Sequence, residues 1–414
     1  MRDATESTIE IDGAPFEPYE PWRLRVLGLL ALLMLIPVTL PVPILRALVH
    51  ERFGVSETLT SLFMSINMIG AVFAAPLAGV LADRFGRRRE LIVAALVADG
   101  FCFIALPLTG EFHVFMAIRF VEGCAHIFAL SLLLALAATS QSENRRGRAM
   151  GLVGAGLLLG VALGAPLGGA LGARSVILPL HFGAGLLFVA AAVAAATLRE
   201  TGRQRARPTM RELVDTVWRH RIVAVPLAFA FADRFTVGFY TTTLSLYLTR
   251  VHAATPGQVG ALIAVFMLPF AVLSYPFGKL AERRSVVALL CGGSVLYGIG
   301  TGLVGFASIP ALFFLMPAIG VAAAVMFVPT MVMTTDLVPE TVRTTALGAF
   351  NAAGSLGFII GPITGGLVSQ WVAESHGWLA GYRAAFAVAG VSELLCVAIA
   401  LPALWRLRRL GLVR

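Results

Sequence analysis

The sequence predicts an all-α membrane protein of twelve transmembrane helices, arranged as two pseudo-symmetric bundles of six helices that lie side by side. Composition, length and an internal glycine repeat predict this class. The chain has 414 residues, of which 58% are hydrophobic and 13% are charged, whereas soluble domains carry about 25% charged residues. Since a spanning helix needs about 20 apolar residues, the chain has room for about twelve. The long, non-alternating apolar runs exclude an outer-membrane barrel.

The expected helices follow the apolar runs and end where charged or turn-forming residues return. In the first half they cover residues 24–48, 58–82, 90–108, 112–139, 147–171 and 176–198. In the second half they cover residues 222–249, 258–280, 286–306, 310–334, 344–369 and 383–404. The chain therefore divides into a cytosolic tail 1–23, an N-terminal bundle 24–198, a cytoplasmic linker 199–221, a C-terminal bundle 222–404 and a cytosolic tail 405–414.

The segments outside the helices set the expected topology. The N-terminal tail is acidic and proline-rich without a basic start, which indicates a disordered tail and not a signal peptide. The linker is rich in arginine and carries a possible short amphipathic helix at Met210–Trp218. Most Lys and Arg residues fall on one side of the predicted membrane, which places both termini in the cytoplasm. This bias explains the net charge of +9 without a nucleic-acid partner. The cysteines lie in apolar runs without disulfide or metal spacing.

Glycines repeat between the two halves of the chain at one constant offset. The matched sets are Gly151, Gly160, Gly164, Gly168 and Gly169 in the first half, and Gly348, Gly357, Gly361, Gly365 and Gly366 in the second. Such a repeat predicts two related bundles. Glycines let helices approach closely, and Pro166 and Pro362 should bend their helices. We expect a tightly packed helix pair at the bundle interface that serves as a pivot.

A dense group of charges separates the second and third expected helices. Its key residues are Gly79, Asp83, Arg84, Gly86, Arg87 and Arg88. Because this group cannot lie in hydrocarbon, it predicts a short loop in water, and its arginines place the loop on the cytoplasmic side. The second half repeats the group as Gly278, Glu282, Arg283 and Arg284.

The spacing of the first group resembles the signature between helices 2 and 3 of the major facilitator superfamily, and the resemblance covers essentially the whole chain. It implies a secondary transporter that works by alternating access. In that family the residue matching Asp83 meets the start of helix 11 when the cytoplasmic side is closed, and a helix N-terminus favours an anion. Here that helix should begin just after Arg343. The arginines of the loop should pair with Asp336, Glu340 or Glu143.

The glycine and proline pattern of residues 348–366 resembles a signature of the drug:proton antiporter branch, although Pro166 lies one place late in the matching first-half pattern. This resemblance implies a monomeric carrier in the bacterial inner membrane that exports small lipophilic or drug-like compounds. Its energy source would be the proton gradient, with no cofactor.

Ionisable residues within the apolar runs are candidate functional groups, because burying them in a membrane is costly. Arg119, Glu122 and His126 share one helical face. The motif Arg119-x-x-Glu122-Gly123 resembles the superfamily's helix 4 signature, with Glu in place of a Gln-like residue. The resemblance implies that Arg119 stabilises a neighbouring carboxylate during proton transfer. The alternative is a structural Arg–Glu pair that neutralises itself.

A second group of polar residues lies in the seventh expected helix, in the second half of the chain. It consists of Asp233, Thr236, Tyr240, Thr243 and Tyr247, at intervals of three and four residues. Such a stripe should face either a watery cavity or an interhelical hydrogen-bond seam. Asp233 is the second candidate proton carrier, and Arg234 should point about 100° away and pair elsewhere.

Other polar residues of the spans rank lower, and other functions stay open. Asn67 is a candidate for the transport path, whereas Asp99 and Glu393 rank below it, because by resemblance their helices pack outside the cavity. An uptake carrier or a lysolipid or metabolite transporter could use the same fold. A membrane enzyme or sensor is the least expected alternative, since the sequence has no HExxH motif and no phosphate-binding glycine loop.

Overall fold

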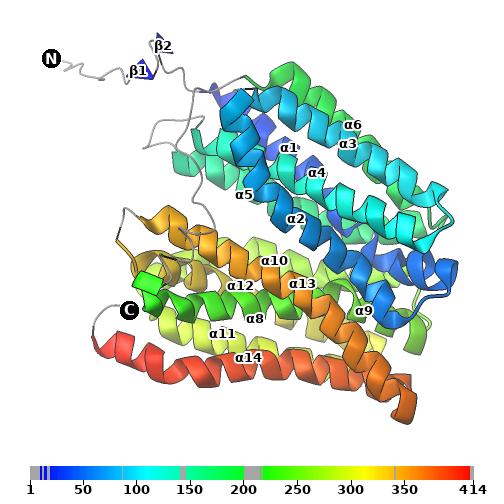
Figure 1. Cartoon of the computed structure of the whole chain (residues 1–414). Helices are drawn as coiled ribbons and strands as arrows, with labels where there is room; N and C mark the ends of the chain where they lie inside the picture. Colours follow the sequence, from blue (N-terminus) through cyan, green and yellow to red (C-terminus); the bar gives the residue numbers. More distant parts are fainter. Residues whose placement is uncertain are drawn as a thin grey trace.

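The computed structural model describes residues 10–11, 14–15, 19–85, 87–139, 146–199, 215, 218–339 and 342–410. Within these residues, 12 helices are long and apolar enough to cross a membrane. They form an N-terminal and a C-terminal bundle that lie side by side (Figure 1). The predicted fold class is therefore confirmed.

Within the described residues, the N-terminal bundle contains six long helices and three short ones. The long helices are α1 (Pro21–Thr39), α2 (Glu57–Phe85), α3 (Arg88–Ala105), α4 (Phe112–Thr139), α5 (Arg146–Gly172) and α6 (Leu178–Thr197). The short ones are the 3-10 helix η1 (Val42–Ile44), the π-helix η2 (Arg46–Glu51) and the 3-10 helix η3 (Leu106–Leu108).

The C-terminal bundle repeats this plan. Its helices are η5 (Arg221–Val223), α8 (Ala224–Thr241), α9 (Thr243–Val251), α10 (Pro256–Arg283), α11 (Val286–Leu303), η6 (Val304–Phe306), α12 (Ile309–Asp336), α13 (Arg343–His376) and α14 (Trp378–Arg409). In the N-terminal tail, which the sequence predicts to be disordered, β1 (Glu10–Ile11) pairs antiparallel with β2 (Ala14–Pro15). Most of the predicted linker helix at 210–218 lies outside the described residues.

The first and seventh expected spans are broken, although the sequence predicts each as one helix. The α-helical part of the first span ends at Thr39, where Pro41 and Pro43 follow and cannot donate backbone hydrogen bonds. The seventh span breaks between α8 and α9, where Thr242 leaves the helical region with φ −129° and ψ −69°. The hydroxyls of Thr241 and Thr242 each donate to the Gly238 carbonyl oxygen at 2.9 Å, and so compete with the helical hydrogen bonds.

Several helices run past their predicted ends. Apolar composition locates the part of a helix in the membrane, but the helix itself continues until a residue breaks it. Thus α13 continues to His376, and Gly377 makes the turn into α14 with φ +80°, a conformation that favours glycine. Likewise α2 continues to Phe85 and α3 begins at Arg88, so most of the charged group predicted to be a loop is helical.

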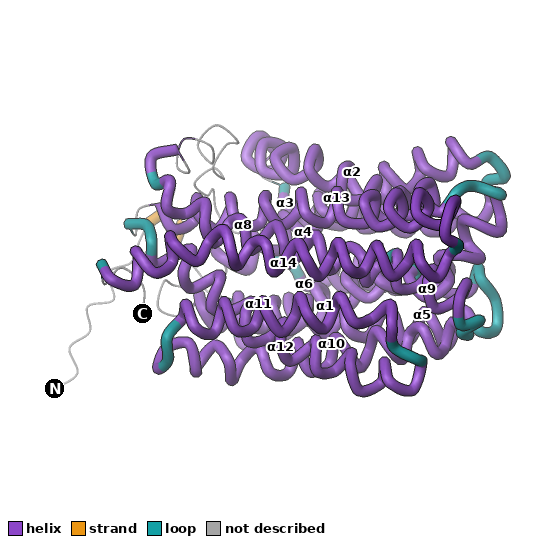
Figure 2. Tube along the Cα trace, turned by 90° about the horizontal axis from the view of Figure 1, so that it is seen from below, coloured by secondary structure: helices purple, strands orange, loops and turns teal. Residues whose placement is uncertain are grey.

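Both described chain ends lie at one end of the bundles, which we call the terminal end; the opposite end is the far end (Figure 1). The two bundles meet chiefly through α2 against α13 and α5 against α10. Figure 2 shows α2 and α13 running alongside each other. Each helix of these pairs belongs to one bundle and contacts a helix of the other bundle. Near the far end, Gly169 of α5 lies against Pro256 of α10, and Gly366 of α13 lies against Thr58 of α2.

The glycine frames hold helices together mainly within each bundle, which corrects the expectation of a packed pair at the bundle interface. A Cβ atom at Gly160 or Gly164 of α5 would overlap the backbone of α1, and one at Gly357 or Gly361 of α13 would overlap the backbone of α8. Gly365 faces the Thr243 hydroxyl. Pro166 and Pro362 lie inside their helices, and a Cβ atom at Gly238 of α8 would overlap the Pro362 ring.

Three glycines of the frames depart from this packing rule. No atom lies within 4 Å of a Cβ placed at Gly151, so this residue has no packing role in the described structure. The last glycine of each frame instead contacts the opposite bundle. Gly169 lies against Pro256, and Gly366 lies against Thr58 and Ser61.

Candidate functional site

The centre of the N-terminal bundle holds a buried ion pair. Arg119 and Glu122 lie one turn apart on α4, and the Arg119 NH1 atom is 2.7 Å from Glu122 Oε2. Both side chains are almost fully buried. Asn67 on α2 donates its side-chain amide to the same carboxylate oxygen, and Arg119 also lies over the Phe63 ring at 4.3 Å. The structure therefore brings three of the predicted site residues together.

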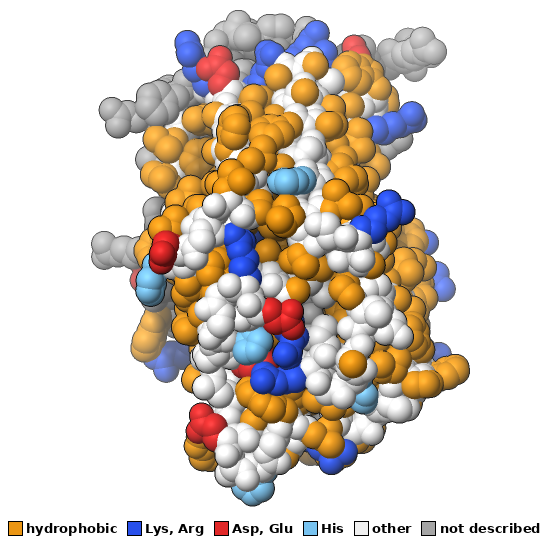
Figure 3. Space-filling view, turned by 90° about the vertical axis from the view of Figure 1, so that its right-hand side faces the viewer, with side chains coloured by type: hydrophobic (Ala, Val, Ile, Leu, Met, Phe, Trp, Pro, Cys, Tyr) orange, Lys and Arg blue, Asp and Glu red, His pale blue; other side chains and the backbone are white. Residues whose placement is uncertain are grey.

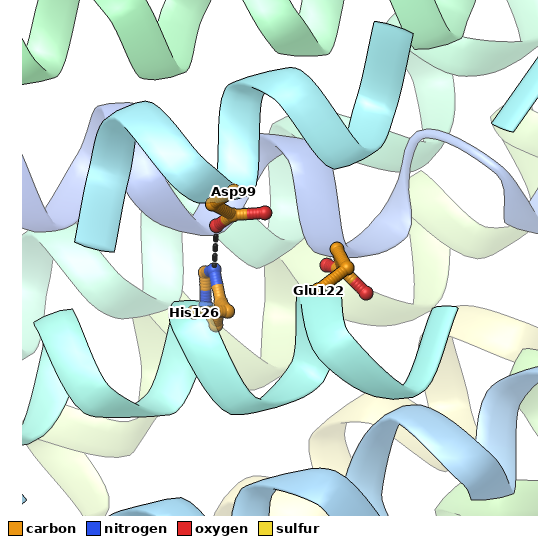
Figure 4. Close-up of side chains that lie close together, drawn as sticks. All are labelled: Asp99, Glu122 and His126. Carbon is orange, nitrogen blue, oxygen red and sulfur yellow. Dashed lines mark hydrogen bonds and ion pairs between the residues drawn. The ribbon is translucent and has the colours of Figure 1, made fainter. Parts of the chain in front are cut away.

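A second buried contact lies one turn further along α4. The His126 Nδ1 atom is 3.0 Å from Asp99 Oδ2 on α3, as Figure 4 shows. Asp99 is fully buried and His126 is 4% exposed. The other polar atoms of the pair, Asp99 Oδ1 and His126 Nε2, have no hydrogen-bond partner among the described residues. Asp99 is thus part of this site, although the sequence ranks it low.

These groups form one buried cluster of acidic and basic side chains. Asp99, Glu122 and His126 each place a ligand-type atom within 4.8 Å of the others, the one such group of His, Cys, Asp or Glu that the described residues contain. By distance alone the cluster could hold a metal ion. Arg119, however, brings a permanent positive charge to Glu122, and guanidinium groups do not deprotonate in proteins. The set therefore suits a mobile proton better than a second cation.

The C-terminal bundle places Asp233 at a small pocket. Asp233 is 8% exposed on α8, and Arg234 NH1 lies 3.5 Å from its Oδ2 atom. The expectation that Arg234 pairs elsewhere is therefore wrong, because its ion-pair partner is Asp233. Its guanidinium also lies over the Phe327 ring at 4.9 Å. The pocket is lined by Phe229, Ala230, Asp233, Ser294, Met326, Phe327, Thr330 and Phe350.

Three of the remaining stripe residues on α8 and α9 form an interhelical seam, whereas the Thr243 hydroxyl has no hydrogen-bond partner among the described residues. The Tyr240 hydroxyl is 2.7 Å from Thr301 Oγ1 on α11, and the Tyr247 hydroxyl donates to the Gly305 carbonyl oxygen at 3.3 Å. Thr236 donates to the Ala389 carbonyl oxygen on α14 at 3.4 Å. Tyr240 is buried to 2% exposure, so it packs inside the bundle and does not line an open cavity. Of the alternatives that the sequence left open, the seam describes these residues.

Charged side chains join the two bundles at the far end. Glu57 at the start of α2 is fully buried and accepts from Arg250 of α9, while Arg46 NH1 lies 4.0 Å from the same carboxylate oxygen. Arg250 also lies over the Trp378 ring at 3.7 Å. Figure 3 faces this end and shows acidic, basic and histidine side chains gathered on it. Nearby His252 has its pKa lowered by burial, so this residue adds no charge at neutral pH.

Further hydrogen bonds join the two bundles, from the far end toward the middle of the helices. The Thr58 hydroxyl donates to the Gln370 side-chain oxygen at 2.9 Å, and the Ser65 hydroxyl donates to the Ile359 carbonyl oxygen at 2.8 Å. Ser245 of α9 donates to the Val42 carbonyl oxygen at 2.6 Å. Together with the Arg250–Glu57 pair, these bonds cross between the bundles, and each lies at the far end or in the middle of the helices.

Most of the predicted latch lies where the structure gives no side-chain description. Gly86 is outside the described residues. Only the backbone is described at Gly79, Asp83, Arg84 and Glu282. Arg87 contacts Glu90 at 3.2 Å, Arg88 is 5% exposed, Arg283 is exposed, and Arg343 donates to the Thr335 carbonyl oxygen at 3.3 Å. The latch stays a prediction.

Sequence reasoning missed two contacts of the site. The Asp99–His126 contact joins two helices and leaves no spacing signal in the chain. Glu57 and Arg250 are far apart in sequence, and each reads as an ordinary charge at a helix end. The one available signal was the position of Asp99 and Glu393 inside apolar runs, which the sequence shows but ranks low.

Comparisons with known proteins agree with this architecture. The family profile of the Major Facilitator Superfamily matches residues 27–241 and 227–411. Multidrug resistance protein 2 of Bacillus subtilis is 23% identical over 58% of this chain, and the match spans only 63% of that relative. The 4-hydroxybenzoate transporter PcaK of Pseudomonas aeruginosa is 28% identical over 40% of this chain and 36% of its own length.

A solved structure shows the same fold over nearly the whole chain. A bacterial homologue of the human lysosomal transporter Spinster, in an inward-facing and unoccupied conformation, superposes with a TM-score of 0.76. Its sequence is 16% identical, and the match covers 93% of this chain and 98% of the homologue. With the family profile extending through both bundles, this multi-pass membrane chain belongs to the Major Facilitator Superfamily of transporters.

Proposed function

We propose that this carrier exports small lipophilic compounds from the bacterial cytoplasm in exchange for protons, by alternating access across the inner membrane. The observation that carries the proposal is the buried cluster of Arg119, Glu122, His126 and Asp99. Ionisable groups at this depth are costly and mark ion pathways by default. A membrane carrier without a proton or ion to move has little use for four of them in one place.

The contacts indicate how a proton would be held. Arg119 keeps its charge throughout, so the proton must reside on Glu122 or on the Asp99–His126 pair. Protonating Glu122 removes the charge that Arg119 and Asn67 hold in place, and frees both groups for other partners. Proton binding thereby changes the interactions between α2 and α4. If the proton binds one conformation of the carrier more tightly than the other, it shifts the equilibrium between them.

The bundle contacts support alternating access. Placing the termini in the cytoplasm, as the positive-inside bias favours, makes the far end periplasmic. The Arg250–Glu57 and Thr58–Gln370 contacts then close the periplasmic side. In the opposite state these contacts part, and Asp83 would engage the start of α13 at the cytoplasmic side. Each state is thus held by contacts that the other lacks.

Transport by the purified protein in proteoliposomes tests this proposal. We expect an imposed pH gradient to drive ethidium, used as a lipophilic cation probe, against its concentration gradient. Glu122→Gln should abolish the pH dependence of this flux. Glu374→Gln, the same change at an exposed position of α13, should leave it intact. Wild-type flux that ignores the pH gradient, or a Glu122→Gln variant with unchanged pH dependence, contradicts the proposal.

A second candidate function is uptake of an aromatic acid. Arg234 is partly exposed beside Asp233, which lines the pocket, and lies over Phe327 and Phe358, at 4.9 and 5.7 Å. A guanidinium beside aromatic rings is a suitable environment for an aromatic carboxylate, and 4-hydroxybenzoate is carried by one relative. Accumulation of radiolabelled 4-hydroxybenzoate by wild-type vesicles, lost in Arg234→Gln, would favour this function over export.

A further inference from the structure

The middle of α14 carries a buried acid that the site described above does not use. Glu393 is 0% exposed, and both of its carboxylate oxygens lack a hydrogen-bond partner among the described residues. No Lys, Arg or His in the described part of the chain lies within ion-pair distance of it. An ionised carboxylate in such a place carries a large penalty, because a buried charge without a partner has lost its hydration. Binding a proton removes that penalty.

The polar groups around Glu393 come from two neighbouring helices. Ser294 and Tyr297 lie near it on α11, and Asp233 of α8 interacts with it electrostatically. The Tyr297 hydroxyl is also fully buried and has no hydrogen-bond partner among the described residues. It interacts electrostatically with both Asp233 and Glu393. Tyr297 is therefore a buried hydroxyl within electrostatic reach of both the inner acid and the acid at the pocket.

The other ionisable groups that face this position offer Glu393 no counter-charge. Arg234 of α8 is paired with Asp233, and Tyr240 is bonded to Thr301. Cys396 of α14 interacts electrostatically with Glu393, and Cys291 of α11 interacts with Cys396, but a thiol brings no positive charge. The titratable residues of α13 are at its two ends, and those of α9 lie at the far end.

The packing beside Glu393 favours a proton over an alkali cation. A Cβ atom at Gly298 of α11 would lie 2.8 Å from the Gly390 carbonyl oxygen of α14, and one at Gly390 would overlap the Gly298 carbonyl oxygen. The two backbones are thus in direct contact one turn from the carboxyl group. A sodium or potassium ion needs a shell of several oxygen ligands, whereas a proton needs one.

We propose that Glu393 is a second proton-binding site of this carrier, located in the C-terminal bundle, and that it exchanges its proton with Asp233 through the Tyr297 hydroxyl. The transfer balances: one O–H bond breaks at Glu393 and one forms at Asp233, while Tyr297 accepts one proton as it donates its own. Tyr297 acts here as a positioning and relay residue. The proposal rests on the proposed proton coupling and adds a proton to its stoichiometry.

Infrared spectroscopy of the purified full-length protein in lipid nanodiscs tests the site without any substrate. A protonated carboxyl group gives a carbonyl band that a carboxylate lacks. We expect wild type to show one such band that is missing in Glu393→Gln and present in the control Glu374→Gln. Tyr297→Phe should shift the frequency of the band, because the neighbouring hydroxyl is gone, and this variant carries the test if Glu393→Gln does not fold.

The opposing results are equally specific. Spectra of Glu393→Gln that match wild type at every pH overturn the proposal. So does a carbonyl band that disappears when sodium chloride replaces choline chloride at constant pH, because an alkali cation would then occupy the site. An unshifted band in Tyr297→Phe overturns the relay.

Transport measurements then separate this proposal from the proposed function. In proteoliposomes, the proton-to-ethidium ratio from reversal experiments should fall by about one proton in Glu393→Gln, while Glu122→Gln loses the coupling altogether. An unchanged ratio in Glu393→Gln overturns the second site alone. Absence of any proton-driven ethidium flux in wild type overturns the proposed function, and the infrared band still decides the state of Glu393.

Discussion

Removing the Arg250 side-chain charge should open the far end of the carrier. Arg250 belongs to the C-terminal bundle, and its partner Glu57 to the N-terminal bundle, so their bond exists only while the bundles meet. In Arg250→Gln the buried Glu57 keeps Arg46, whose NH1 atom is 4.0 Å away. When the far end opens, water reaches Glu57 and the loss of Arg250 no longer matters. The substitution therefore penalises one conformation selectively.

The size of the shift follows from the contacts. Removing one partner of a fully buried ion pair costs about 3–5 kcal/mol, but the Arg250 side chain is 23% exposed and Arg46 remains. A hydrogen bond to a charged group, worth about 1.5–3 kcal/mol, is the better guide. Since about 1.4 kcal/mol corresponds to a factor of ten, the equilibrium should move about 10- to 100-fold toward the state open at the far end.

Double electron–electron resonance, which measures distances between spin labels, can detect this change. Spin labels at Glu111→Cys and Ser308→Cys lie on exposed far-end turns of the two bundles, in a background without the native cysteines. We expect the long-distance population to grow in Arg250→Gln. Arg383→Gln is the matched control, because Arg383 donates at 3.1 Å to the Gly305 carbonyl oxygen within its own bundle.

A double-mutant cycle completes the test. Glu57→Gln should shift the populations in the same direction, and the double variant should add little, because both changes break one bond. Identical distance distributions in wild type and Arg250→Gln would refute the assignment of this contact as the far-end seal. A shift of equal size in Arg383→Gln would show that the effect is not specific to the bundle contact.

Three further predictions test packing, the buried pair and the latch. Gly164→Ala should lower the melting temperature, because its Cβ atom would overlap the α1 backbone at a cost of about 1–3 kcal/mol, whereas Gly151→Ala, with open space, should not; equal melting curves would contradict the packing. Asp99→Asn should make ethidium flux insensitive to His126→Gln, because the contact between the two groups is already lost; additive effects would separate them. Asp83→Asn should abolish transport while size-exclusion chromatography shows a folded protein, and full flux would count against the latch.

The sequence predicted most of the architecture, because local chemistry determines it. Apolar runs locate the membrane spans, and the Arg119–Glu122 spacing of three residues places both groups on one helix face, where they do form a pair. The glycine frames correctly indicate close packing, since a small residue marks where backbones meet. Their partner helices were not predictable, because the repeat specifies register but not which neighbour it faces.

What the sequence could not supply depends on tertiary position. Asp99 meets His126 only because α3 and α4 pack side by side, and hydropathy alone ranks an isolated acid low. The break at Thr242 depends on hydroxyl bonds to Gly238 that compete with the helix, and a run of apolar residues continues on both sides of it. The seam of Tyr240 and Thr301 was open to two interpretations until its partners were known.

The terminal glycines of the two frames have a mechanical consequence. At Gly169 and Gly366 the atoms of the opposite half that lie nearest are main-chain atoms and the short side chain of Ser61. A joint built in this way has almost no rotamers to rearrange when the halves swing past each other. We therefore expect little friction at the joint itself, so that the ionisable groups, and not the hinge, govern how fast the carrier cycles.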